Sequence, residues 1–90
     1  MEFEWNEAKR IANIDKHHLD FADADLLFGG QHFVGLAKTI EAERRWMATG
    51  TIDDVHVTAV DTMREEKIRL ISLRKARNGE RNRFQKLFGR

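Results

Sequence analysis

The sequence contains no cysteine, no proline and no tyrosine. Without cysteine the chain can form neither a disulfide bond nor a thiolate zinc site, which fits a reducing compartment. No apolar run approaches the ~18 residues of a transmembrane helix, and the mean hydropathy is −0.60. The acidic start, from Met1 to Trp5, lacks the basic and apolar regions of a secretory signal. We therefore expect a protein that is neither secreted nor inserted in a membrane.

Short motifs of common enzyme classes are missing as well. The four histidines, His17, His18, His32 and His56, form no pair at i and i+4 and no HExxH motif. The chain also lacks Gly-x-Ser-x-Gly, a phosphate-binding P-loop and GxGxxG. The sequence therefore predicts no metal site, and no cofactor is expected.

A chain of 90 residues has room for one domain, which we expect to span residues 1–90. Apolar periodicity, helix caps and turn residues predict the elements. They are a strand at 3–5, a helix at 7–16 capped by Asn6, a helix that Asp20 caps and Gly29 ends, a strand at 33–37, strands at 44–49, 51–60 and 67–74, and a helix at about 77–87. A turn near Thr49-Gly50 is expected to join two of these strands. The sequence thus predicts an α+β fold, with two N-terminal helices and a C-terminal helix packed on an antiparallel β-sheet.

The net charge of +1 conceals an asymmetry between the two halves of the chain. Residues 1–43 carry 4 basic and 9 acidic side chains, a net charge of −5, whereas residues 44–90 carry 12 basic and 6 acidic ones, a net charge of +6. The last 17 residues, from Arg74 onward, hold 7 of these basic groups and one acid, Glu80. A basic segment after an acidic one indicates an anionic partner, and a solvated helix face is the plain alternative.

Imidazole and guanidinium groups could together cleave RNA without a metal ion. An imidazole moves protons near neutral pH, and guanidinium groups bind phosphate oxygens through paired hydrogen bonds. The candidates are Lys16 and His17 at the end of the first helix, Arg64 in a turn, Arg69, Arg74 and Lys75 on or just after the strand at 67–74, and Arg77 and Arg81 at the start of the last helix.

Simpler roles stay open for these residues when spacing alone is considered. Lys16 and His17 could form an exposed, polar helix end. Arg69 could form a cross-strand ion pair. Glu80 and Arg81 could form a local ion pair of little energetic weight.

Several blocks of the sequence carry a family resemblance. They are Glu2 to Lys9, Asn13-x-x-Lys16-His17 with Phe21, Glu43-Arg44-Arg45-Trp46 with Gly50, Thr62-Met63-Arg64, and Ile68 to Ala76 with Glu80-Arg81. Together these blocks, which span residues 2–81 in order, resemble the BrnT-type toxins of bacterial BrnT/BrnA toxin–antitoxin systems. The block from Ile68 to Ala76 is the strongest.

This resemblance implies a RelE-like fold and a ribonuclease that arrests translation and growth in the bacterial cytoplasm. It also implies a cognate BrnA-like antitoxin with a ribbon-helix-helix domain, which neutralises the toxin in a heterotetramer and alone contacts operator DNA. The family's basic signature falls here on Lys16, His17, Arg64, Arg69, Arg74 and Lys75. We therefore expect Lys16, His17, Arg64 and Arg74 to be catalytic, and Arg69, Lys75, Arg77 and Arg81 to bind the RNA substrate.

Three positions depart from the family's pattern. His18 stands where the family usually has glycine, and Asp61 and Phe84 stand where it often has tyrosine. Because the chain has no tyrosine, a mechanism that uses a phenol is excluded. Two other interpretations stay open. One is a non-catalytic module of the same fold that binds an antitoxin or RNA, and the other is an RNA-binding accessory protein outside any toxin operon.

Overall fold

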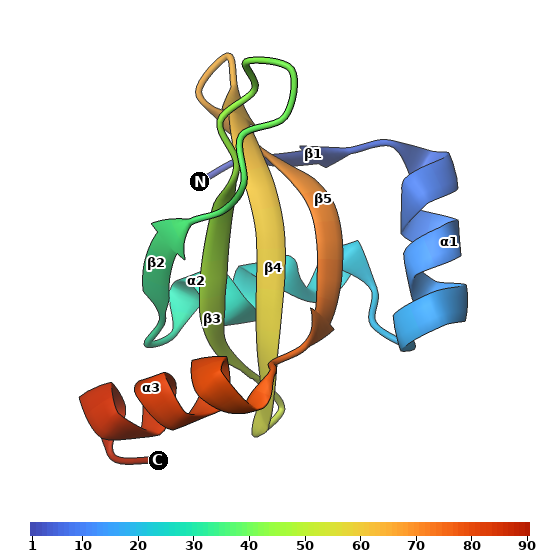
Figure 1. Cartoon of the computed structure of the whole chain (residues 1–90). Coiled ribbons are helices and arrows are strands. Elements are labelled where there is room, and N and C mark those ends of the chain that lie inside the picture. The colour runs from blue at the N-terminus through green and yellow to red at the C-terminus, as the bar shows by residue number, and fades with distance from the viewer.

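The computed structural model describes residues 1–90 and contains one five-stranded sheet with helices on both of its faces and at its edge (Figure 1). The elements in order are β1 (Phe3–Trp5), α1 (Glu7–His17), the 3-10 helix η1 (Phe21–Asp23), α2 (Ala24–Gly29), β2 (Phe33–Leu36), β3 (Trp46–Ile52), β4 (Val55–Arg64), β5 (Lys67–Lys75) and α3 (Asn78–Phe88). The α+β class and the three α-helices are therefore as predicted. No helix is long and apolar enough to cross a bilayer.

The sheet is mixed, so the prediction of an antiparallel sheet is wrong at one edge. The strand order is β1-β5-β4-β3-β2, and β1 runs parallel to β5 while the other neighbours are antiparallel. Tight turns force antiparallel pairing between β3, β4 and β5. No such turn joins β1 to β5, because most of the chain lies between them. The direction of β1 is thus set by the helices that follow it.

Helix α1 begins at Glu7 as predicted and ends at His17, one residue beyond its predicted end. The Asn6 side chain accepts a hydrogen bond from the Lys9 backbone N–H, which caps the first turn. At the other end His18 adopts the left-handed conformation, with φ of 59°, and its N–H bonds to the Ile14 carbonyl. Glycine adopts this conformation most readily, so the imidazole at position 18 is accommodated at a modest cost.

The turn predicted at Thr49-Gly50 is wrong, because β3 runs through both residues to Ile52. The chain reverses instead at Asp53 and Asp54, with φ of 50° and 65°, a backbone typical of two-residue hairpins. Gly50 has a packing role. A Cβ atom there would lie 2.5 Å from Leu27 Cδ1, so glycine lets α2 approach β3 closely.

The second helix also differs from its prediction. Asp20 accepts a hydrogen bond from the Ala22 N–H, as a cap should, but the turn it begins is the 3-10 helix η1. The α-helical part starts only at Ala24, and Gly29 is its last residue rather than the one beyond it. Figure 1 shows this short helix behind the sheet, with α3 across the opposite face at one end.

The hydrophobic core lies between the sheet and the helices η1 and α2. Its buried members are Phe21, Ala24 and Leu27 from the helices, and Ala48, Ile52, Val57, Ala59, Ile68, Leu70 and Leu73 from the strands. On the other face Phe84 of α3 is buried against the ring of His56, with ring centroids 5.2 Å apart. The sheet therefore has a core face, under α2, and an opposite face, under α3.

Helix α1 is fixed to the edge of β5 by the buried side chain of Asn13. Strand β1 covers that edge only from Ile68 to Leu70. Further along, Asn13 Nδ2 donates to the Leu73 carbonyl at 2.8 Å, and the Leu73 N–H donates to Asn13 Oδ1 at 3.1 Å. The amide thus replaces a neighbouring strand and satisfies backbone groups that would otherwise lie unpaired. It also sets where the end of α1 lies.

Candidate active site

The end of α1 brings Lys16 and His17 together beside β5. Both line a shallow depression of about 260 Å³, with Ile71 and Ser72 of β5 forming another part of its wall. Asn13 lies in the same depression, one helical turn before His17. Its hydrogen bonds to Leu73 therefore hold the two predicted catalytic residues against the sheet.

The surroundings of His17 lower the pKa of its imidazole and so favour the neutral form at physiological pH. Partial burial lowers the pKa of His17 below its ordinary value of 6.5, and the positive charges of Lys16, Arg74 and His18 act in the same direction. A neutral imidazole at physiological pH can accept a proton. The positive charge of Arg74 therefore acts on His17, although Arg74 does not line the depression and follows Ser72 by two residues along β5.

Arg74 is held in place by a carboxylate from α3. Its Nη1 and Nη2 donate to the two carboxylate oxygens of Glu80 at 2.8 and 3.0 Å, a bidentate pair whose side chains are 14% and 15% exposed. Glu80 also accepts from the Arg77 N–H and the Thr58 hydroxyl. These contacts, led by the hydrogen bonds from Arg74 and opposed by burial, lower the pKa of Glu80 to about 2. The pair is therefore fully ionised near neutral pH.

Two threonines extend this network across the sheet. The hydroxyls of Thr49 and Thr58 lie 2.8 Å apart, and both side chains are buried. Thr58 has a single proton, which it donates to Glu80, so Thr49 is the donor to Thr58. We call Thr49, Thr58, Arg74 and Glu80 the Arg74 network. It ties β3, β4 and β5 to the start of α3.

A groove of about 570 Å³ opens over this network, between α3 and the strands β2 and β3. It is lined by Phe33, Gly35, Leu36, Met47, Thr49, Arg77, Gly79, Glu80 and Arg83, and we call it the α3 groove. Arg77 and Arg83 make no ion pair, and the guanidinium of Arg83 lies 5.2 Å from the centroid of the Phe33 ring. The groove therefore presents two free cations beside the paired Arg74.

Arg83 is a residue that sequence reasoning missed. In the sequence it is one of several basic residues in the tail, with no spacing that separates it from Lys86 or Arg90. The signal that could have identified it is structural. It lies on the side of α3 that faces Phe33, and this placement follows only from the way the helix docks on the sheet.

The other predicted substrate-binding residues are distributed elsewhere. Lys75 and Arg81 lie together with His56 around a separate depression of about 290 Å³. Arg69 forms an ion pair with Glu4 on the neighbouring strand β1, at 2.6 Å. This is the cross-strand pair that the sequence left open as an alternative to RNA binding. A local pair between Glu80 and Arg81 does not form, since Glu80 binds Arg74 and Arg81 donates to the Asn78 side chain.

Arg64 lies far from the other predicted catalytic residues. It is at the end of β4, opposite Lys67, whereas Arg74 pairs with Thr58 near the other end of the same ladder. The six-residue distance along β4 between Thr58 and Arg64 corresponds to about 20 Å. Arg64 instead lines a depression of about 420 Å³ with Arg44. The structure thus places Lys16 and His17 in one depression, with the charge of Arg74 acting on His17, and it places Arg64 at the far end of the β4–β5 ladder from Arg74.

No three side chains of histidine, aspartate or glutamate gather in an arrangement that could hold a metal ion. The charged and polar groups gather instead in two places: the ammonium of Lys16 and the imidazole of His17 beside β5, and the guanidinium groups of Arg77 and Arg83 in the α3 groove. Such groups bind anions and transfer protons.

Fold and site together define a small α+β protein whose sheet carries cations at one edge and on one face. A family model described as the ribonuclease toxin BrnT of type II toxin-antitoxin systems matches residues 5–80. The chain therefore belongs to the BrnT family of ribonuclease toxins. Membership of this family implies an RNA target and an antitoxin partner. Among curated proteins no similar sequence is found.

Proposed function

We propose that this protein is a toxin endoribonuclease that cleaves RNA without a metal ion and so arrests translation and growth. Family membership supports the ribonuclease class. The observation that carries the proposal is the placement of His17, which lies with Lys16 against β5 and within the field of Arg74. We infer that these three residues form the catalytic centre.

The proposed reaction needs two proton transfers and one displacement. Neutral His17 removes the proton from a ribose 2′-hydroxyl, whose oxygen attacks the adjacent phosphorus. The bond from phosphorus to the 5′-oxygen then breaks, and Lys16 donates a proton to that leaving oxygen. The products are a 2′,3′-cyclic phosphate and a 5′-hydroxyl. Arg74 stabilises the negative charge that develops on the phosphoryl oxygens, for which a positioned donor is worth roughly 2.7–4 kcal/mol.

Binding of the RNA strand is assigned to the cations that lie free around this centre. The guanidinium groups of Arg77 and Arg83 in the α3 groove are exposed and unpaired, so they are open to phosphate oxygens. The exposed ring of a base can stack where Phe33 and Arg83 meet. Lys75 and Arg81 extend the cationic surface at the same end of β5, whereas Arg64 and Arg69 have no place in this path.

We further propose that a BrnA-like antitoxin with a ribbon-helix-helix domain neutralises the protein in a heterotetramer in the bacterial cytoplasm. Operator DNA would then contact the antitoxin only, and the toxin would share the RelE-like helix arrangement. An antitoxin that covers the free cations should bring carboxylates to them. Such pairing speeds association, so binding should weaken as salt rises.

The test is RNA cleavage in excess EDTA by the protein purified without its antitoxin. Wild type should cleave, while His17→Ala and Arg74→Ala should lose most of the activity. His18→Gly is the matched control, because it removes the neighbouring imidazole and suits the left-handed backbone at that position. If folded His17→Ala and Arg74→Ala both cleave as well as wild type, the assignment of the centre is wrong.

One observation favours a second function, a non-catalytic module that binds the antitoxin or RNA. Arg74 gives both of its terminal nitrogens to Glu80, as a purely structural arginine would. Induced expression in bacteria separates the two functions. Growth arrest that the neighbouring gene product relieves supports the toxin, and unaffected growth supports the module.

A further inference from the structure

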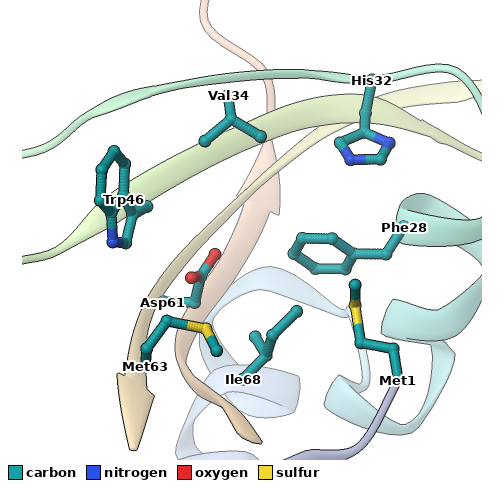
Figure 2. Close-up of a pocket in the computed structure, with 8 residues that line it drawn as sticks. All are labelled: Met1, Phe28, His32, Val34, Trp46, Asp61, Met63 and Ile68. Carbon is teal, nitrogen blue, oxygen red and sulfur yellow. The ribbon is translucent and has the colours of Figure 1, made fainter. Parts of the chain in front are cut away.

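A further cavity lies on the core face of the sheet, where α2 ends and leaves the strands uncovered (Figure 2). It encloses about 320 Å³ and is lined by Met1, Phe28, His32, Val34, Trp46, Asp61, Met63 and Ile68. We call it the Asp61 pocket. Since side chains alternate along a strand, Trp46 faces this pocket while Met47 faces the α3 groove. The pocket is therefore on the opposite face of the sheet from the proposed RNA-binding surface.

Asp61 is the unusual member of this pocket. The residue is 5% exposed, and its carboxylate, whose oxygens keep a small accessible surface, makes no hydrogen bond and no ion pair with any residue of the chain. Figure 2 shows the carboxylate pointing into the cavity, towards the space between Val34 and Phe28. Burial without a partner raises the pKa of Asp61 to about 6, so the group is mostly ionised at neutral pH. A buried, unpaired carboxylate is costly and favours a cationic partner.

The remaining polar group of the pocket is a second acceptor. Nδ1 of His32 lies 2.8 Å from the Gly30 carbonyl, so Nδ1 carries the proton and Nε2 is the acceptor of the neutral ring. No lysine or arginine lines the pocket, and the other walls are apolar and aromatic. An occupant that satisfies this lining has N–H donors, a positive charge and an apolar stem.

The exposed apolar rim of the pocket favours a protein partner over a small molecule. Val34 and Met63 are each 55% exposed, and no element of this chain covers them. A small amine would fill the pocket and leave this apolar rim in water, whereas a protein surface would cover both. Aromatic walls suit the stem of a long basic side chain, which packs its methylene groups against Trp46 and Phe28.

We propose that the Asp61 pocket receives a lysine or arginine side chain of the antitoxin, with its cation on Asp61 and its stem between Trp46 and Phe28. The inference rests on the antitoxin partner that family membership implies. It places an antitoxin contact on the face away from the cations, so neutralisation involves both faces of the sheet.

The test measures the affinity of the purified toxin for the product of the neighbouring antitoxin reading frame by titration calorimetry, without RNA. Asp61→Asn keeps the shape of the side chain and removes its charge, and it should weaken binding at least 30-fold, as the truncation of one partner of a buried charged pair does. Asp25→Asn, an exposed aspartate on α2, is the matched control and should change affinity less than twofold. Met63→Ser, which alters only the exposed rim, should weaken binding several-fold.

Several outcomes would overturn the proposal. They are unchanged affinity in Asp61→Asn, equal losses in Asp61→Asn and Asp25→Asn, and no binding to the wild-type toxin. A further arm uses butylguanidinium as a free cation and butylurea as its neutral analogue. Binding of butylguanidinium to the pocket with no effect of Asp61→Asn on the antitoxin would show a small-molecule site instead. RNA cleavage is assayed separately, so loss of the proposed ribonuclease function leaves these readings unaffected.

Discussion

Ionised Glu80 should contribute more to stability than any other carboxylate of this protein. It accepts hydrogen bonds from Arg74, Arg77 and Thr58, and its pKa falls from an ordinary value of 4.5 to about 2. Each pKa unit corresponds to about 1.4 kcal/mol, so ionised Glu80 contributes about 3 kcal/mol to the free energy of unfolding. Because the folded pKa is the lower one, this contribution is complete above pH 4.5 and is lost as pH falls towards 2.

Glu80→Gln removes the charge, keeps the length of the side chain and leaves the mostly buried guanidinium of Arg74 without its carboxylate partner. We expect a loss of about 2–3 kcal/mol at pH 7, which lowers the Tm of a domain of this size by roughly 10–20 °C. Thermal and urea unfolding between about pH 2 and pH 7 would measure it. Glu41→Gln, at an exposed position, is the control and should change nothing. Equal stabilities of Glu80→Gln and wild type at pH 7, with parallel pH profiles, would refute the reasoning.

Three further predictions concern other parts of the fold. Asn13→Ala removes two hydrogen bonds to the Leu73 backbone and should lower the free energy of unfolding by about 2–4 kcal/mol in urea titrations; an unchanged value would contradict the role of Asn13 at the edge of β5. Arg83→Ala should raise the KM for RNA and reduce the salt dependence of binding by about 0.7 in the log–log slope, and an unchanged slope would remove Arg83 from the binding surface. Burial raises the pKa of Asp61 from 3.8 to about 6, so wild type should lose up to about 3 kcal/mol as pH rises through that range. Asp61→Asn should not show this loss, and parallel unfolding profiles of the two proteins would contradict an unpaired Asp61.

The sequence predicts most elements of the fold, because local signals agree with the tertiary structure. Asn6 caps α1 as its side chain and spacing indicate, and the alternation of Phe3 and Trp5 marks β1. The errors occur where a distant contact overrides a local preference. Gly50 looks like a turn residue, yet it lies inside β3 because Leu27 approaches within the space that a side chain would need. The parallel direction of β1 is another such case, since no turn sets it.

The sequence predicts which residue types form the site, but it predicts their arrangement in space only in part. Lys16 and His17 lie together as adjacency and a helix end indicate. The pairing of Arg74 with Glu80 follows from the docking of α3 on β3 and β4, which no spacing in the sequence describes. The separation of Arg64 from Arg74 could not be predicted either. Both arginines lie in sequence blocks that resemble the BrnT family, but the β4–β5 pairing places them near opposite ends of one ladder.

Single-turnover RNA cleavage in EDTA as a function of pH tests most directly whether neutral His17 is the catalytic base. The rate of wild type should rise with pH, reach its midpoint below 6.5 and stay level above it, because burial and neighbouring cations lower the pKa of His17. His17→Ala should lose at least about 100-fold in rate together with this pH dependence, while His18→Gly retains both. A folded His17→Ala protein with the rate and the pH profile of wild type would contradict the account.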